Sequence, residues 1–108
     1  MNNFETTLLI SSDITENNLD KISKEFEKLV GNQGGLIVGK ENWGLRNLSY
    51  KINSLKKAFY YFFQINIEGQ KIQTLKKNIS QNEKIFRYLF IKVNTHDELP
   101  TRMLGGNE

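Results

Sequence analysis

The sequence predicts an α+β domain in which four strands and two helices follow one another in the order β-α-β-β-α-β. Alternating and aromatic-rich segments, typical of strands, occur at four places within residues 4–93. Two segments with apolar residues every three or four positions, typical of amphipathic helices, lie between them. Stretches that contain glycine, asparagine and serine stand at the junctions, where turns are expected.

The first strand and the first helix account for the N-terminal third of the chain. Residues 4–10 are apolar or β-branched on alternate sides, which predicts a strand. Residues 12–14 are expected to turn the chain, and Thr15 has a side chain suited to the N-cap of a helix. We expect Gly31 to end that helix in the left-handed conformation. The apolar stripe of the helix is Leu19, Ile22, Phe26, Leu29 and Val30.

Two strands are predicted in the middle of the chain. The first covers residues 36–52, with Gly44 as a bulge or bend. Residues 53–57 are predicted to form a turn. Residues 59–67 give the strongest strand signal in the sequence, because aromatic and β-branched residues dominate them.

A short helix and a last strand complete the domain. The helix is predicted from the spacing of Ile72, Leu75 and Ile79, with Asn82 as its terminator. The strand is predicted at residues 85–93. The order is that of the ferredoxin-like fold, an antiparallel sheet with both helices on one face and the other face open.

The sequence divides into one domain and a short tail. We place the domain at residues 1–94 and expect residues 95–108 to be a flexible tail. His96 falls in this tail beside two acidic residues, and we expect it to be solvated and not catalytic.

The composition disfavours several classes of protein. The 108 residues are enough for one domain, and the absence of cysteine excludes disulfides and thiolate chemistry. No apolar run approaches the roughly 20 residues that span a membrane, and the first residues lack a secretory signal. We find no metal-ligand spacing, phosphate-binding glycine loop or Ser-His-Asp set. We therefore expect no catalytic residue, metal, cofactor, small-molecule substrate or membrane partner.

The positive charge is concentrated in the middle of the chain. Residues 1–39 hold three Lys against six acids, a net charge of −3. Residues 40–92 hold eleven Lys and Arg against three acids, a net charge of +8. Residues 93–108 hold one Arg against three acids, a net charge of −2. This distribution predicts a surface that faces a polyanion, and the alternative is a solvated basic face that keeps the protein soluble.

Alternation along two strands predicts which side chains face the helices. In residues 59–67 the odd-numbered side chains are apolar throughout, whereas the even-numbered ones begin aromatic and end polar. We expect the odd-numbered set to be buried and the even-numbered set to lie on the open face. In the last strand, Tyr88 and Phe90 should point inward, and Arg87 should point outward with Leu89 and Ile91.

An apolar patch is therefore expected on the open face, made of Tyr60, Phe62, Leu89 and Ile91. A patch of this kind usually marks a partner. The alternative is that the tail or a long loop covers it.

Similarity to a known family is carried by residues 4–7, by residues 43–52, and by residues 57–60 and 82–88. Through these segments, over about residues 3–95, the sequence resembles the bacterial small-subunit ribosomal protein six family. The opening Phe4-Glu5-Thr6-Thr7 is similar to the family's aromatic-Glu-x-x start. Residues 43–52, WGLRNLSYKI, are similar to its Gly-Leu-Arg-Arg-Leu-Ala-Tyr-Pro-Ile signature. Residues 57–60 and 82–88 agree in spacing and order. Asn47 and Lys51 depart from the signature, where a second basic residue and a proline are usual.

The resemblance implies a ferredoxin-like fold and a place in the platform of the small ribosomal subunit, in the cytoplasm. It also implies pairing with small-subunit protein eighteen, and joint binding to the central domain of the small-subunit ribosomal RNA. These partners follow from the resemblance and not from composition or periodicity.

The residues themselves supply candidates for both kinds of contact. Lys40 and four further cations occupy the predicted hairpin of residues 36–67 against one acid, Glu41, and we expect these groups to neutralise phosphates. The RNA-binding candidates are Arg46, Lys51, Lys56, Lys57 and Arg87, the arginines being suited to bidentate phosphate contacts. The protein-partner candidates are Trp43, Leu45, Tyr60, Phe62, Leu89 and Ile91. The alternative for Trp43 is core packing beside the Gly44 bend.

Two other functions share the predicted fold. An RNA-recognition motif would stack bases on Phe59 and Tyr61, but alternation places both residues on the buried side. An enzyme or small-ligand sensor would need a set of converging polar groups, which the sequence does not contain.

Overall fold

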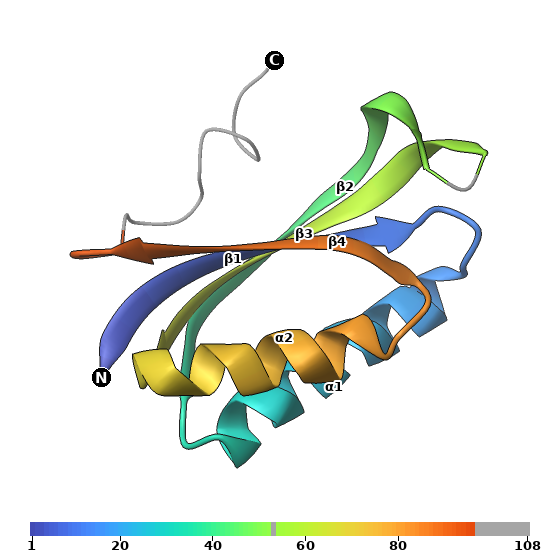
Figure 1. Ribbon diagram of the computed structural model, residues 1–108. Coiled ribbons are helices and arrows are strands. Elements are labelled where there is room, and N and C mark those ends of the chain that lie inside the picture. Colours follow the sequence, from blue (N-terminus) through green and yellow to red (C-terminus); the bar gives the residue numbers. More distant parts are fainter. Residues whose placement is uncertain (53, 97–108) are drawn as a thin grey trace.

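The structure is a computed structural model that describes residues 1–52 and 54–96. The order of its elements is β-α-β-β-α-β, as predicted. They are β1 (Asn2–Ser11), α1 (Glu16–Asn32), β2 (Leu36–Ile52), β3 (Leu55–Ile67), the short 3-10 turn η1 (Gly69–Lys71), α2 (Ile72–Ser80) and β4 (Ile85–Val93). The antiparallel sheet has the strand order β2-β3-β1-β4, and both helices cover one of its faces (Figure 1). The predicted α+β, ferredoxin-like fold is confirmed.

The hydrophobic core lies between the sheet and the two helices. Phe63 of β3 is fully buried, and its ring lies 4.5 Å from that of Phe26 on α1. Each such side chain contributes about 1.5–3 kcal/mol when it leaves water. The odd-numbered side chains of residues 59–67 face this core, as alternation predicted. The core is made of Phe4, Leu8, Ile10, Leu19, Ile22, Phe26, Val30, Tyr61, Phe63, Ile65, Ile67, Ile72, Leu75 and Ile79.

The ends of helix α1 show one correct prediction and one error. Thr15 is the N-cap, and its hydroxyl accepts a hydrogen bond from the backbone N–H of Asn18 at 3.2 Å. Gly31 does not end the helix, which continues to Asn32. The residue in the left-handed region is Gly34, with φ +80°, and the N–H of Gly35 then bonds the carbonyl of Val30 at 2.9 Å.

The β2–β3 hairpin is longer than predicted. Ile52 pairs with Leu55, so a two-residue connection replaces the expected turn over residues 53–57. Ser54 has φ +69°, the sign that such tight hairpin turns require. Because β1 pairs only with residues 58–67 of β3, the hairpin tip (residues 47–52 and 54–57) projects beyond the sheet (Figure 1).

The predicted bulge at Gly44 is present. The β2–β3 register shifts between Asn42 and Gly44, and Gly44 has φ +80°. The side chain of Asn42 accepts a hydrogen bond from the N–H of Gly44 at 2.9 Å, which stabilises this backbone conformation. A one-residue bulge reverses the face on which the following side chains lie.

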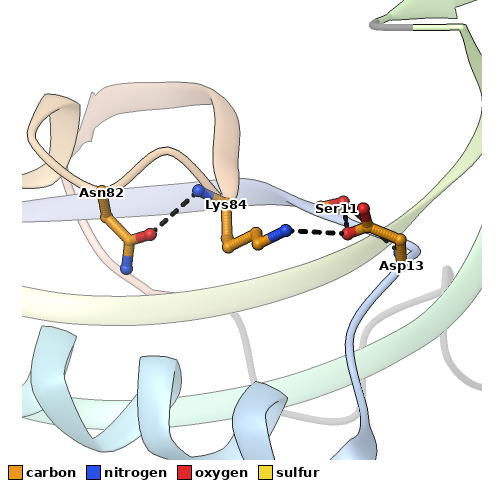
Figure 2. Close-up of polar contacts among 4 residues, drawn as sticks. All are labelled: Ser11, Asp13, Asn82 and Lys84. Atoms are coloured by element: carbon orange, nitrogen blue, oxygen red, sulfur yellow. Dashed lines mark hydrogen bonds and ion pairs between the residues drawn. The ribbon is translucent and has the colours of Figure 1, made fainter.

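The loop before β4 is tied to the end of β1 by polar contacts (Figure 2). The backbone N–H of Ser11 donates to the carbonyl of Lys84 at 2.7 Å. Helix α2 ends at Ser80, two residues before the predicted terminator Asn82, whose side chain instead accepts from the N–H of Lys84 at 2.9 Å. These contacts fix where β4 starts. Residues 97–108, most of the predicted tail, lie outside the described residues.

Candidate functional site

The hairpin tip is the most strongly basic part of the described surface. In the sequence, the tip and the adjacent Arg46 (residues 46–57) hold Arg46, Lys51, Lys56 and Lys57 and no acidic residue. The three lysine side chains are exposed, and none has an ion-pair partner within residues 1–52 and 54–96. The tip therefore presents three lysines that no acidic side chain of the described residues neutralises through an ion pair.

Arg46 is held more firmly than the lysines. It lies opposite Ala58, on the side of the sheet that the helices leave open. Its side chain is half-buried, and its Nε donates to the backbone carbonyl of Trp43 at 3.1 Å. The bulge at Gly44 thus brings a strand carbonyl to the guanidinium and orients it.

Trp43 packs on its own sheet. Its ring stacks on Phe62 with centroids 4.9 Å apart and an interplanar angle of 12°. Its indole N–H donates to the carboxylate of Glu41 at 2.8 Å. Phe62 is only 7% exposed as a result. Trp43 therefore packs against its own sheet, as the alternative interpretation of this residue proposed. Its half-buried ring also borders the open face.

Leu45 is separated from the other protein-partner candidates. It lies opposite Phe59, whose side chain packs against the core, so Leu45 faces the side of α1. It lines a depression there together with Asp20 of α1. The cause is the Gly44 bulge, which places Trp43 and Leu45 on opposite faces although they are two residues apart.

The open face of the sheet consists of cross-strand rows, since residues paired in register share a face. In one row Phe62 pairs with Thr7, and Thr7 pairs with Leu89. In the next row Glu5 lies between Gln64 and Ile91.

The predicted apolar patch is therefore divided. Thr7 and Glu5 separate the β3 aromatics from Leu89 and Ile91, which are 54% and 50% exposed. Arg87, also exposed, lies opposite Leu9 on the same face. Sequence reasoning missed Glu5 as a residue of this face, although its alternation with the buried Phe4 and Thr6 is a signal that could have found it.

Lys40 is not among the available cations. Its ammonium lies 2.7 Å from the carboxylate of Glu27 on α1, and this hydrogen bond raises the pKa of Lys40 above its ordinary value. The expectation that Lys40 neutralises phosphate is wrong, because the register of β2 directs it toward the helices.

His96 is not solvated, contrary to expectation. Its side chain is only 10% exposed and lies on the open face. Its Nδ1 is 3.6 Å from Glu5 Oε2, and its Nε2 is 3.1 Å from the carbonyl oxygen of Ile65. The chain after β4 therefore crosses β1 as far as β3.

The described residues also bear on metal binding, membrane spanning and the RNA-recognition-motif alternative. No group of three or more His, Cys, Asp or Glu able to hold a metal occurs in the part of the chain that the structure describes. No helix of that part is long and apolar enough to cross a membrane. Tyr61 is 8% exposed and Phe59 packs against the core, so the aromatic pair of the RNA-recognition-motif alternative faces the helices.

Comparisons with known proteins all point to the same protein family. A family model described as ribosomal protein S6 matches residues 3–92. Small ribosomal subunit protein bS6 of Rickettsia felis is 38% identical over 104 residues, which cover 96% of this chain and 86% of the relative. The protein of the same name from Rickettsia prowazekii is 38% identical over the same length.

A solved structure supports the fold. The crystal structure of 30S ribosomal protein S6 from Thermotoga maritima superposes with a TM-score of 0.81 at 19% sequence identity. The match covers 85% of this chain and 87% of that one.

Proposed function

The chain belongs to the ribosomal protein S6 family and is a structural protein of the small subunit of the cytoplasmic ribosome; from this premise we propose how it is held there. Its basic hairpin tip binds the central domain of the small-subunit ribosomal RNA. Its open face docks small-subunit protein eighteen. Together these contacts support assembly of the platform. The observation that carries the proposal is the acid-free tip, with its exposed lysines beside an oriented arginine.

The RNA contact is mainly electrostatic. Lys51, Lys56 and Lys57 release counterions when they approach phosphates, so binding weakens steeply with salt. The Nε of Arg46 donates to the Trp43 carbonyl, which restricts the orientation of the guanidinium on the open face, and a guanidinium is suited to phosphate contacts. Contacts of this type position the protein on folded RNA and carry little sequence information.

The protein contact uses the apolar part of the open face. Leu89 and Ile91 are about half exposed on the edge strand β4, next to Arg87. Trp43 and Tyr60 border the same face from the other side of β1. Exposed apolar side chains beside an aromatic and an arginine are typical of the anchors in protein interfaces.

A matched pair of lysine variants tests the RNA contact. Lys56→Ala/Lys57→Ala removes two exposed charges at the tip, whereas Lys76→Ala/Lys77→Ala removes two neighbouring charges on α2, on the far side of the sheet. Binding to a central-domain RNA fragment is measured with and without protein eighteen at several salt concentrations. We expect the tip variant to bind more weakly, with a salt slope smaller by about 0.7–0.9 for each lost contact. Equal losses in both variants would contradict a specific role for the tip.

Sedimentation of cell lysate tests the assignment as a whole. The chain is expected to travel with small subunits in a sucrose gradient at low salt and to dissociate partly at high salt. A chain that stays at the top of the gradient at low salt is not held by the subunit, and the proposal then fails.

A further inference from the structure

His96 lies between two hydrogen-bond acceptors on the open face. Glu5 Oε2 of β1 lies 3.6 Å from its Nδ1, and the Ile65 carbonyl of β3 lies 3.1 Å from its Nε2. The β2–β3 register shifts between Ile37 and Gly39, opposite Ile65 and Gln64. Such a shift locally disrupts the ladder, which is consistent with a strand carbonyl that accepts from a side chain.

The two acceptors together favour a positively charged group. A neutral imidazole has one N–H and can donate to only one of them, whereas the protonated ring donates to both. Nδ1 is in fact buried with no hydrogen-bond partner among the described residues, although the carboxylate of Glu5 lies within ion-pair distance of it. Glu5 and the Ile65 carbonyl therefore form a site for a cation that His96 fills incompletely.

The position of this acceptor site points to a protein partner. Glu5 pairs with Ile91, so the carboxylate lies directly beside the exposed apolar side chains of β4. A carboxylate repels phosphate, so this part of the open face disfavours RNA. A polypeptide that packs an apolar residue on Leu89 and Ile91 can place a neighbouring lysine or arginine at Glu5.

We propose that Glu5 and the Ile65 carbonyl bind a lysine or arginine side chain of the protein that docks on the open face, and that His96 occupies this site in the free chain and must be displaced. This inference rests on the proposed docking of small-subunit protein eighteen. Only molecules in which His96 has left the site can bind the partner's cation. The apparent affinity for the partner is therefore the intrinsic affinity multiplied by the fraction of such molecules. Its removal therefore tightens binding without any new contact.

Titration calorimetry of the full-length chain with purified protein eighteen tests the proposal. We expect His96→Ala to bind about three- to tenfold more tightly than the wild type. Thr95→Ala, a change at the exposed neighbouring residue, should bind like the wild type. In the His96→Ala background, Glu5→Gln should weaken binding at least about tenfold, because it removes the charge that the partner's cation meets. Circular dichroism verifies that each variant is folded, and His96→Gln replaces His96→Ala if the latter is not.

The outcomes separate this inference from the proposed function. If the wild type binds and His96→Ala binds equally or more weakly, the displacement of His96 is wrong while docking on the open face stands. If Thr95→Ala tightens binding as much as His96→Ala, the effect belongs to the segment and not to the imidazole, and the inference fails. If neither the wild type nor His96→Ala binds, both proposals fail.

Discussion

Lys84 places its ammonium 3.2 Å from the carboxylate of Asp13 and so joins the loop after β1 to the loop before β4 (Figure 2). The hydroxyl of Ser11 donates to the same carboxylate. The hydrogen bond from Ser11 and, after it, the contact with Lys84 hold the pKa of Asp13 below its ordinary value. Because β4 carries Arg87, Leu89 and Ile91, this contact helps to fix the edge of the proposed docking face.

The Asp13 contact predicts a loss of stability in acid. The pKa of Asp13 is lower in the folded than in the unfolded chain, so its contribution is complete above about pH 4 and is lost as the pH falls through the folded value. Urea unfolding of the wild type and Asp13→Asn should therefore show a small difference in the free energy of unfolding at neutral pH, since the pair is exposed. That difference should shrink in acid. A difference that does not change with pH would show that the charge of Asp13 contributes nothing.

Gly35 predicts a loss of stability from crowding at the start of β2. A Cβ atom at this position would lie 2.9 Å from Val30 Cγ1, 3.0 Å from Ile67 Cγ1 and 3.1 Å from the Asn66 carbonyl oxygen. Because two of these neighbours belong to the packed core and one is backbone, they have little room to move. We expect Gly35→Ala to lower the free energy of unfolding by about 1–3 kcal/mol, measured by urea denaturation.

Gly31 is the control for Gly35, because the same substitution should have the opposite effect on stability there. It lies inside α1, and a Cβ atom there would meet nothing within 4 Å. Gly31→Ala should therefore stabilise the protein by about 0.5–1 kcal/mol, because glycine is the costlier residue in a helix. Effects of the same sign in both variants would contradict the packing argument.

Thr6 predicts a gain in stability. Its hydroxyl is fully buried on the helix side of β1 and has no hydrogen-bond partner within the described part of the chain. Valine has nearly the same shape without the polar atom, so Thr6→Val should raise the free energy of unfolding by about 1 kcal/mol. Thr7→Val, on the open face, is the control and should change stability by less than about 0.5 kcal/mol. A loss of stability in Thr6→Val would mean that the hydroxyl has a partner in solution.

The sequence alone predicted the orientation of side chains correctly where a periodic pattern coincided with burial. Alternation in residues 59–67 gave the face of every β3 side chain in that range, because one-sided burial of a strand leaves a two-residue repeat. It also gave the inward direction of Tyr88 and Phe90, which lie opposite Leu8 and Thr6. The N-cap at Thr15 followed from local chemistry that needs no tertiary information.

The errors arose where the outcome depends on contacts between distant segments. The Gly44 bulge was expected, but its consequence for Leu45 depends on the register against β3. Lys40 lost its expected role because Glu27, on a separate element, neutralises it. His96 follows the last strand, and nothing near it in the sequence indicates that it reaches Glu5 and Ile65. The concentration of cations in residues 46–57 could be read from the sequence, because it depends only on local composition, whereas their role in RNA binding stays a prediction.

Trp43 offers a direct report on protein docking. It is the only tryptophan in the sequence, and its half-buried ring borders the open face through its stack on Phe62. Docking of protein eighteen on that face should exclude water from the ring and move its fluorescence emission to shorter wavelength. RNA bound at the hairpin tip without the partner should move the emission much less.

The tip variant separates the two contacts in the same fluorescence measurement. Lys56→Ala/Lys57→Ala lies beyond the edge of the open face, so it should weaken RNA binding and leave the emission shift caused by protein eighteen unchanged. Phe62→Leu should reduce the emission shift caused by protein eighteen and leave RNA binding unchanged, because it removes the ring that supports Trp43 and leaves the lysines in place. If protein eighteen binds with no change in emission, it docks away from Trp43. The interface would then be confined to β4, where Leu89 and Ile91 are exposed.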